Sequence, residues 1–360
     1  MLHRILLIGA LLGAATLSIG HAADLTEGMK KGTPDLKSAG PATFAPQGIL
    51  LLGDSQGATV FAIATGDTAS GSPAQPLNIE RIDEQIAALL GTSPKEITIN
   101  DLAVNPETGN AFLTVSRGTG PAAKPVIIRV DASGKLGEFS LADKLFSLAS
   151  IPNAAQDKGR QEVTTDLQFV DGQVIVAGLS NEEFASQLRV LAFPFAKVEP
   201  GASVEIFHGA HGKYETRSPV RTFAVYNIGG EPNVLAAYTC TPLVKFPVSD
   251  LKSGTKVQGT TVAELGNRNK PLDMIVYQKD GKDYLLMANS SRGVMKVNVE
   301  NIDKEAGITA KIANTAGLPY ETIAELQGVV QLDKWGDAQA LILTQEPATK
   351  VMTLRTIALP

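Results

Sequence analysis

Cysteine and histidine are scarce in this 360-residue chain, which has one cysteine, Cys240, and four histidines. A single cysteine excludes an intrachain disulfide, so packing must hold the fold together. Two histidines, His3 and His21, lie in an N-terminal segment that we expect to be removed. The other two, His208 and His211, both fall in the stretch FHGAHGKYETRSP at 207–219. Chemistry that needs imidazole is therefore confined to one short segment of the mature chain.

An excess of positive charge is also missing, because the formal net charge is -5 and the lysines are scattered. A mildly acidic chain of this kind is a poor nucleic-acid binder, so we expect no nucleic-acid partner. There is no Gly-rich phosphate loop and no nucleophile elbow. With 44% hydrophobic and 19% charged residues, the chain can form a sizeable core.

Long hydrophobic runs are absent except at the N-terminus, MLHRILLIGALLGAATLSIGHAADL. Arg4 precedes an apolar run that ends near Ile19, and the small residues Gly20 and Ala22 precede a cleavage point before Ala23. The run is about 15 residues, shorter than the roughly 20 needed to span a membrane. This pattern predicts a signal peptide at 1–22, a periplasmic or secreted protein, and no membrane span after cleavage.

Two further regions are predicted beyond the signal peptide. Residues 23–46 are rich in Gly, Pro, Lys, Ala and Thr, lack periodicity and indicate a flexible lead-in. From 47 to 360 the chain becomes a series of short β-type runs separated by turn residues, which we interpret as one domain.

The β-type runs repeat as units of about four strands. Five full units begin at Asn100, Thr165, Arg221, Leu272 and Gln327, and a partial unit begins at Gly48. The second residues of the full units, Asp101, Asp166, Thr222, Asp273 and Gly328, are separated by 65, 56, 51 and 55 positions. Fourth strands are expected near Leu136, Ser203 and Thr260. A period of four strands per 50 to 60 residues is typical of a β-propeller, here of six blades with seven as the alternative. A sandwich or barrel does not explain this period.

Two insertions have helical spacing. NIERIDEQIAALLG places Ile79, Ile82, Ile86, Leu89 and Leu90 on one face, with Asn78 as a candidate cap. SLADKLFSLASI, from Ser140, is shorter and similar. Both are expected to be helices in blade connections that cover one face of the ring.

The arrangement resembles the broad group of exported propellers that includes the NHL, YVTN and lactonase-like families. The resemblance rests on strand spacing and on phrases such as DLAVNPETGNAFLTV and DGKDYLLMANSSRGVMKV. It covers nearly the whole mature chain and implies a fold. No catalytic motif of these families matches, so it implies no activity.

The repeat places Asp101, Asp166 and Asp273 at equivalent entries to innermost strands, on one face of the ring. Two interpretations remain open. The carboxylates either converge on the channel and bind a hard cation such as Ca²⁺, or accept backbone N–H bonds that fix the turn of each blade.

Basic residues fall near the same face. They are Arg160, Arg217, Arg268, Lys270 and Arg292. They either recognise an anionic ligand through paired hydrogen bonds or form an ordinary solvated rim.

The repeat also places His208, His211 and Cys240 on one face of one blade. Two imidazoles and a thiolate suit zinc or copper. The alternative is a flexible polar loop beside a buried, inert cysteine.

These patterns predict an exported, monomeric β-propeller that acts as a binding or scaffolding module. Its channel face would engage a protein partner or a small ligand. A second hypothesis is a lactonase-like hydrolase with a metal held by carboxylates in the channel, and a third is a soft-metal (Cu/Zn) protein. Whether the protein is an enzyme stays open.

Overall fold

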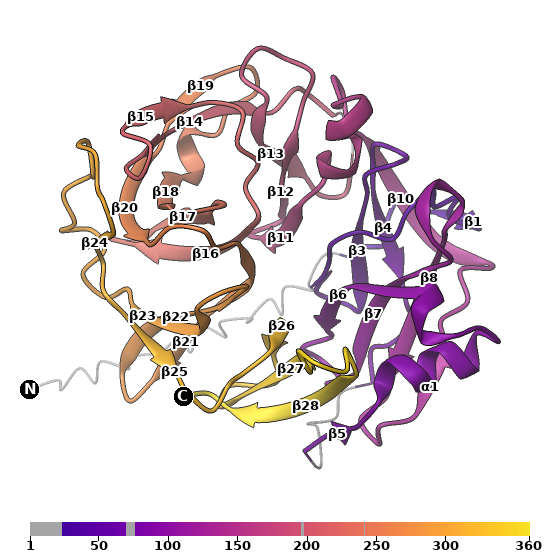
Figure 1. Ribbon diagram of the computed structural model, residues 1–360. Coiled ribbons are helices and arrows are strands. Elements are labelled where there is room, and N and C mark those ends of the chain that lie inside the picture. The colour runs from indigo at the N-terminus through magenta and orange to yellow at the C-terminus, as the bar shows by residue number, and fades with distance from the viewer. Residues whose placement is uncertain (1–23, 70–75, 196–197, 241) are drawn as a thin grey trace, which may run out of the picture.

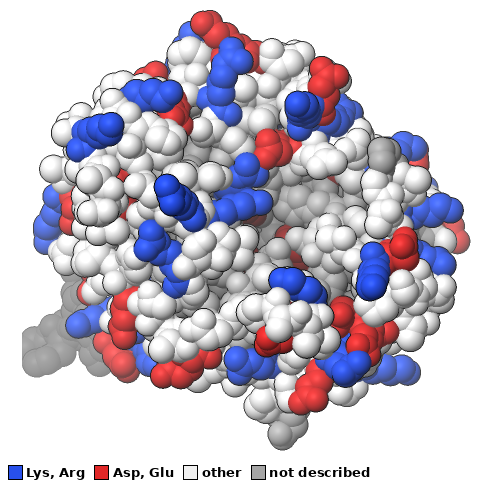
Figure 2. All heavy atoms as spheres, in the orientation of Figure 1, with Lys and Arg blue, Asp and Glu red and all other residues white. Residues whose placement is uncertain are grey.

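Six mainly antiparallel β-sheets surround a central axis in the computed structural model (Figure 1), and a hollow marks the axis in the space-filling view (Figure 2). The structure describes residues 24–69, 76–195, 198–240 and 242–360, so the predicted signal peptide lies outside them. The predicted all-β, six-bladed propeller is confirmed. No helix among the described residues is long and apolar enough to cross a membrane.

The blades are numbered in sequence order, and their strands run from the axis outward. Blade 1 contains β2 (Ala42–Ala45), β3 (Ile49–Asp54), β4 (Thr59–Ala64), β10 (Lys144–Ser150) and β1 (Lys30–Gly32). Blade 2 contains β6 (Ile97–Val104), β7 (Ala111–Arg117), β8 (Lys124–Val130) and β9 (Leu136–Glu138). Blade 3 contains β11 (Asp166–Val170), β12 (Gln173–Leu179), β13 (Ser186–Ala192), β14 (Ala202–His208) and β15 (Lys213–Glu215), and β19 (Lys256–Gln258) also pairs with β14.

Blade 4 contains β16 (Thr222–Ile228), β17 (Glu231–Ala237), β18 (Pro242–Pro247), β20 (Thr260–Leu265) and β24 (Thr315–Gly317). Blade 5 contains β21 (Pro271–Lys279), β22 (Lys282–Asn289), β23 (Gly293–Asn298) and β25 (Tyr320–Ile323). Blade 6 contains β26 (Val329–Lys334), β27 (Gln339–Gln345), β28 (Met352–Ala358) and β5 (Asn78–Ile79). The helices are α1 (Ile82–Leu89) and the 3₁₀ turns η1 (Pro94–Glu96), η2 (Gly120–Ala122), η3 (Asp157–Glu162) and η4 (Val248–Asp250). The fourth strands predicted near Leu136, Ser203 and Thr260 are β9, β14 and β20.

Two-residue turns join the innermost strand to the second strand in three blades. Their residues are Asp171-Gly172, Gly229-Gly230 and Asp280-Gly281, and all six have positive φ. A two-residue hairpin favours this conformation because its twist matches that of the flanking strands, and Asp-Gly and Gly-Gly adopt it readily. These dipeptides therefore determine where the hairpins reverse, at the end of the channel opposite the strand entries.

Blades 1 and 2 are interleaved, so the order around the ring differs from the order in the chain. The chain leaves blade 1 after β4, supplies β5 to blade 6 and builds all of blade 2. It then returns to blade 1 as β10, whose residue Phe146 pairs with Ile63 of β4. Because the innermost strands of blade 1 contact those of blades 2 and 3, and blade 2 contacts blade 6, the ring runs 3-4-5-6-2-1.

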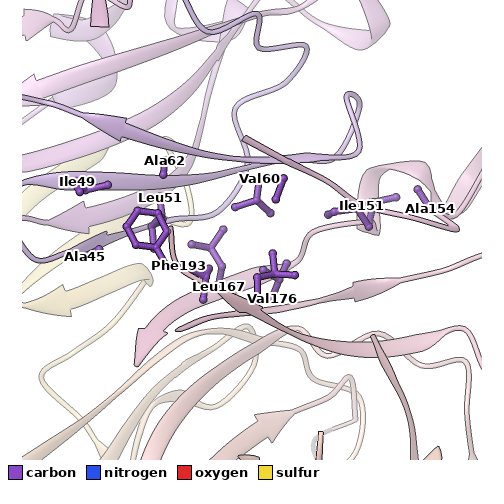
Figure 3. Close-up of a cluster of buried hydrophobic side chains, with 14 of the residues drawn as sticks. Ala45, Ile49, Leu51, Val60, Ala62, Ile151, Ala154, Leu167, Val176 and Phe193 are labelled. Atoms are coloured by element: carbon purple, nitrogen blue, oxygen red, sulfur yellow. The ribbon is translucent and has the colours of Figure 1, made fainter. Parts of the chain in front are cut away.

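The hydrophobic core is divided into six clusters, one between each pair of neighbouring blades. Figure 3 shows the cluster between blades 1 and 3, where Leu51 and Val60 face Leu167 and Val176. All four side chains are at most 1% exposed. Each blade therefore buries both of its faces only because the ring is closed, and closure is the condition for the core to form.

The first predicted helix exists but is shorter than expected. Its predicted start, Asn78–Ile79, is strand β5, which pairs with β28 in blade 6. Ile82 and Ile86 are buried among side chains of blades 2 and 6, whereas Leu89 is 46% exposed. Helix α1 therefore packs over the junction between blades 2 and 6 rather than across a face of the ring.

Two predictions about local structure were wrong. The segment from Ser140 is not helical, because Lys144–Ser150 is strand β10. Only Phe146 and Ala149 of this strand are buried, so its apolar spacing of three imitates a helix. The predicted flexible lead-in, 23–46, includes β1 and β2, so the propeller begins before residue 47.

Candidate functional site

A cavity of about 720 Å³ opens at the end of the channel where the innermost strands begin. All six innermost strands contribute to its wall, together with the segment 37–41 and the connections that enter β11, β16 and β21. Figure 2 shows this hollow with acidic and basic side chains at its edge. The ring closure therefore creates one polar concavity that every blade helps to line.

Four aspartates line this cavity, one on the innermost strand of each of four blades. They are Asp101, Asp166, Asp273 and Asp333. Asp333 is not among the predicted residues, because the repeat aligns the sixth unit on Gly328, five positions earlier. A carboxylate on the last innermost strand was nevertheless visible in the sequence as a further acidic residue in an apolar run.

Each of these carboxylates accepts a backbone hydrogen bond from a neighbouring blade. The Oδ2 atoms accept N–H bonds from Ala42 (to Asp101, 2.7 Å), Phe223 (to Asp166, 2.7 Å), Leu332 (to Asp273, 2.8 Å) and Val104 (to Asp333, 2.7 Å). The Oδ1 atoms of Asp166, Asp273 and Asp333 accept the N–H of the next residue in their own strands. The aspartates thus connect neighbouring blades to one another. The prediction that each aspartate accepts backbone N–H bonds places those bonds within a single blade.

Their position deep in the ring changes their acidity. Burial raises the pKa of Asp101 to about 8, with Asp166 and Asp333 adding like charge, and it raises the pKa of Asp166 to about 7. Burial and the nearby Asp101 raise the pKa of Asp273 well above its usual range, and burial raises that of Asp333 to about 6. Around neutral pH the channel therefore holds a mixture of carboxylates and protonated carboxyl groups.

Cationic side chains lie at the mouth of the cavity. Arg221 donates from Nη1 to Glu162 Oε1 at 2.6 Å and from Nε to Thr239 Oγ1 at 3.1 Å. Lys270 lies close to this pair, and burial and the charge of Arg221 lower its pKa. The entrance thus has two cations near one carboxylate, Glu162, which is bonded to Arg221.

The other predicted basic residues do not line the cavity. Arg160 donates from Nε and Nη2 to the carbonyl oxygen of Gln56, and Arg292 donates from Nη2 to that of Asn267. Arg217 and Arg268 are exposed. Of the five predicted residues, the cavity includes Lys270 alone.

The two histidines lie at the outer edge of blade 3, away from the channel wall. His208 ends β14 and His211 sits in the turn to β15, where the N–H groups of His211 and Gly212 bond to the carbonyl of His208. The ring centroids are 3.8 Å apart. Glu215, the last residue of β15, bonds to both rings: its Oε2 lies 3.0 Å from His208 Nδ1 and its Oε1 lies 2.6 Å from His211 Nδ1. We call these three residues the histidine corner.

Burial sets the charge state of the histidine corner. The side chain of His208 is 3% exposed and that of Glu215 is 14% exposed, whereas that of His211 is 47% exposed. Burial lowers the pKa of His208, against the opposing effect of Glu215. Burial also works to raise the pKa of Glu215, but hydrogen bonds from His211, His208 and Ser218 outweigh it and lower that pKa to about 2.

A second carboxyl group, Glu264 of blade 4, supports the same turn. Its Oε1 accepts the N–H of Gly209 at 2.5 Å, and its buried Oε2 has no hydrogen-bond partner among the described residues. Burial raises the pKa of Glu264 to about 7. The turn is thus attached to blade 4 as well as blade 3.

Cys240 is not part of the histidine corner. It lies in the turn between β17 and β18 with φ of 62°, and its N–H bonds to the carbonyl of Asn269 at 2.9 Å. Among the described residues, the cluster of ligand-type side chains around the histidines contains Glu215 in its place. The structure therefore brings together His208 and His211 but not the predicted third residue.

Comparison with known proteins gives likeness in fold alone. No protein-family model matches the chain, and no curated protein matches it. Solved structures that resemble it include a PQQ-bound aldose sugar dehydrogenase from Streptomyces coelicolor, with 10% identity over 91% of this chain and 96% of the other and a TM-score of 0.38. A putative glucose dehydrogenase from Thermus thermophilus has 12% identity over 91% and 99%, with a TM-score of 0.37. A streptogramin B lyase has 6% identity over 92% and 97%, with a TM-score of 0.37. The chain is a six-bladed β-propeller, and these likenesses add no family to that fold.

Proposed function

We propose that the protein is an exported binding module whose channel mouth holds a small organic acid that carries hydroxyl or amino groups. The observation that carries this proposal is the cavity of about 720 Å³, which has a cationic entrance and carboxyl groups below it. Its volume is in the range of small-molecule sites, which are concave and have a few convergent polar groups. A concave site of this size suits a small ligand better than a flat protein partner.

The entrance supplies the anion-binding half of the site. Arg221 uses Nη1 and Nε on Glu162 and Thr239, and within the described part of the chain nothing bonds to its Nη2, which is available to a ligand. Among the described residues, no hydrogen bond or ion pair engages the Nζ atom of Lys270. A carboxylate at the entrance would therefore meet two charge-assisted donors against one competing carboxylate, Glu162.

The deeper wall supplies groups for a hydroxyl or amino end. The buried hydroxyl of Thr165 has no hydrogen-bond partner among the described residues. The aspartates retain acceptor positions, because a carboxyl group offers about four lone-pair sites and the backbone bonds occupy only some of them. The protonated aspartates can also donate. A ligand with an anionic end and several hydroxyl or amino groups matches this sequence of groups from entrance to floor.

The lactonase-like alternative is less well supported than binding. A metal-dependent hydrolase needs carboxylates that converge on one ion, but among the described residues Asp101, Asp166 and Asp273 do not form a group of ligand atoms within 4.8 Å of one another. Each of these carboxylates already accepts backbone N–H bonds that join blades. Because all three carboxylates join blades, they are better explained as a structural scaffold around a binding cavity.

Calorimetric titration with gluconate, glycerate and serine tests the proposal, with sorbitol as the uncharged counterpart of gluconate. We expect at least one acid to bind and sorbitol not to bind. Lys270→Gln should weaken binding about tenfold or more, since it removes a charge-assisted bond. Arg217→Gln is the matched control, because Arg217 is exposed and does not line the cavity. Absence of binding by all three acids, or equal weakening by the control, contradicts the proposal.

Export is tested separately. The full chain, expressed with its own N-terminus in a Gram-negative bacterial host, should appear in the periplasmic fraction with Ala23 as its first residue. Retention in the cytoplasm with Met1 intact would remove export from the proposal and leave the channel site unaffected.

A further inference from the structure

The histidine corner is a second candidate site, separate from the channel. His208, His211 and Glu215 each offer one ligand atom, and these atoms lie within 4.8 Å of one another. We propose that these three residues bind one divalent transition-metal ion. The proposal does not depend on the function of the channel, because none of the three residues lines the channel cavity.

The donor set fits such an ion. Imidazole nitrogen and carboxylate oxygen bind Zn²⁺ at about 2.0 to 2.2 Å, and two protein nitrogens with one carboxylate form a recurrent three-ligand set that leaves a position for water. Ligands around a tetrahedral ion lie about 3.3 Å apart, given these bond lengths. The Nδ1 atoms of His208 and His211 lie 3.0 Å and 2.6 Å from the Glu215 oxygens. Small side-chain movements therefore suffice to admit an ion among them.

The hairpin holds the ligands in place without the ion. His208 and Lys213 are paired across β14 and β15, and Ile206 is paired with Glu215. Ser218 donates to Glu215 Oε2 at 2.8 Å, and Glu264 of blade 4 accepts the N–H of Gly209 within the turn. A preorganised set of this kind loses little conformational freedom when it binds a metal.

His208 is buried and His211 is half-exposed, and this difference suits the entry of a metal ion. The Nε2 atom of His208 is buried without a hydrogen-bond partner among the described residues, so on that ring only Nδ1 has a polar contact, with Glu215. The ring of His211 is 47% exposed, which gives solvent and ions a path to the corner. Two fixed ligands and one accessible ligand form a site that an ion can reach and water can complete.

The surrounding charges identify the competing interpretation. Lys213 Nζ lies 3.9 Å from Glu215 Oε1, but its side chain is 67% exposed and can turn toward solvent when an ion binds. Without an ion, Glu215 simply clamps the two rings by hydrogen bonds. Zinc titration of the parent and its variants separates a metal site from this clamp.

The untagged full chain, with His3 and His21 replaced by alanine, is treated with a chelator and titrated with ZnCl₂ by calorimetry. We expect one zinc per chain, and a melting temperature that rises with zinc. His211→Ala and Glu215→Gln should each weaken zinc binding about a hundredfold or more, since each removes one ligand of three. Cys240→Ser is the matched control and should bind zinc as the parent does.

Co²⁺ substitution identifies the ligands. We expect visible d–d absorption bands from nitrogen and oxygen ligation, lost in His211→Ala, with no near-ultraviolet thiolate charge-transfer band. His211 is half-exposed, so its alanine variant should fold with a parent-like far-ultraviolet circular dichroism spectrum even if Glu215→Gln does not. Three results would overturn the proposal: no zinc binding by the parent, unchanged binding in His211→Ala, or a thiolate band that disappears in Cys240→Ser.

Discussion

The channel aspartates and the histidine corner both place carboxyl groups inside the protein, but they satisfy them differently. In the channel, Asp273 and its three counterparts receive backbone N–H bonds from neighbouring blades. In the corner, Glu215 receives its bonds from side chains of its own hairpin and the residues that follow it, and His208 Nε2 is left without a partner among the described residues. The first arrangement depends on the closed ring, whereas the second is local. Buried carboxyl groups therefore join blades in the channel, whereas Glu215 joins side chains within one local segment.

The largest expected effect comes from removing a channel carboxyl group. Asp273→Ala leaves the buried N–H groups of Leu332 and Met274 without acceptors, so we expect unfolding free energy to fall by about 2 to 4 kcal/mol. Asp273→Asn keeps one acceptor oxygen but turns an amide nitrogen, which cannot accept, toward the second N–H group. It should cost about 1 to 2 kcal/mol, less than the alanine variant, because only one N–H group loses its acceptor. Urea denaturation near pH 6 measures both, and an equal loss in the two variants would contradict this difference.

The pH dependence of stability should have opposite signs in the two regions. In the channel, burial gives Asp101 a pKa of about 8 and Asp166 a pKa of about 7, against about 3.9 when unfolded. The folded state therefore binds more protons between these values, and unfolding free energy falls as pH rises from about 5 to about 8, by on the order of 1 to 3 kcal/mol. Denaturation curves at the two pH values test this. Asp101→Asn with Asp166→Asn should flatten the decline, and an unchanged decline would assign it to other groups.

The corner should contribute at the acid end. Hydrogen bonds that outweigh burial lower the pKa of Glu215 to about 2, so its contribution is present above about pH 4.5 and is lost as pH falls toward 2. Burial lowers the pKa of His208, so its contribution is present above about 6.5 and is lost as pH falls through its folded pKa. Glu215→Gln should cost about 1 kcal/mol at neutral pH and reduce the acid decline. Thermal melts between about pH 2 and 5 measure it, and a parent-like acid decline would contradict the role of Glu215.

The smallest effect is expected at Cys240, which belongs to neither region. Its hydrogen bond to Asn269 is made by the backbone, so Cys240→Ser should change unfolding free energy by less than about 0.5 kcal/mol. It should also leave zinc and ligand binding unchanged. A clear loss of zinc binding or of ligand binding would place the thiol in a binding site and contradict the geometry described above.

The sequence was sufficient for the blades because turns and alternating apolar runs are local signals. It also located three of the four channel aspartates, since they recur with the repeat. Asp333 was missed because it stands later in its strand, where it bonds to Val104 at the far end of β6. Glu215 rather than Cys240 lies beside the histidines because of their distance from the channel axis. His208 and His211 begin a connection at the outer strand of blade 3, and only the end of that connection reaches the axis. Nor could the pattern reveal β10, whose partner β4 belongs to an earlier blade.

The interleaving of blades 1 and 2 also governs what an incomplete chain can do. When β9 has been synthesised, blade 2 has all four strands while blade 1 still lacks β10. Blade 6 is incomplete until β28 is synthesised, although its edge strand β5, the partner of β28, comes from the early part of the chain. A chain that ends before β28 therefore leaves β5 unpaired beside α1 and leaves one edge of β27 unpaired at its new C-terminal end. Proteases would have access to a truncated chain at these two places, and only the complete chain protects both.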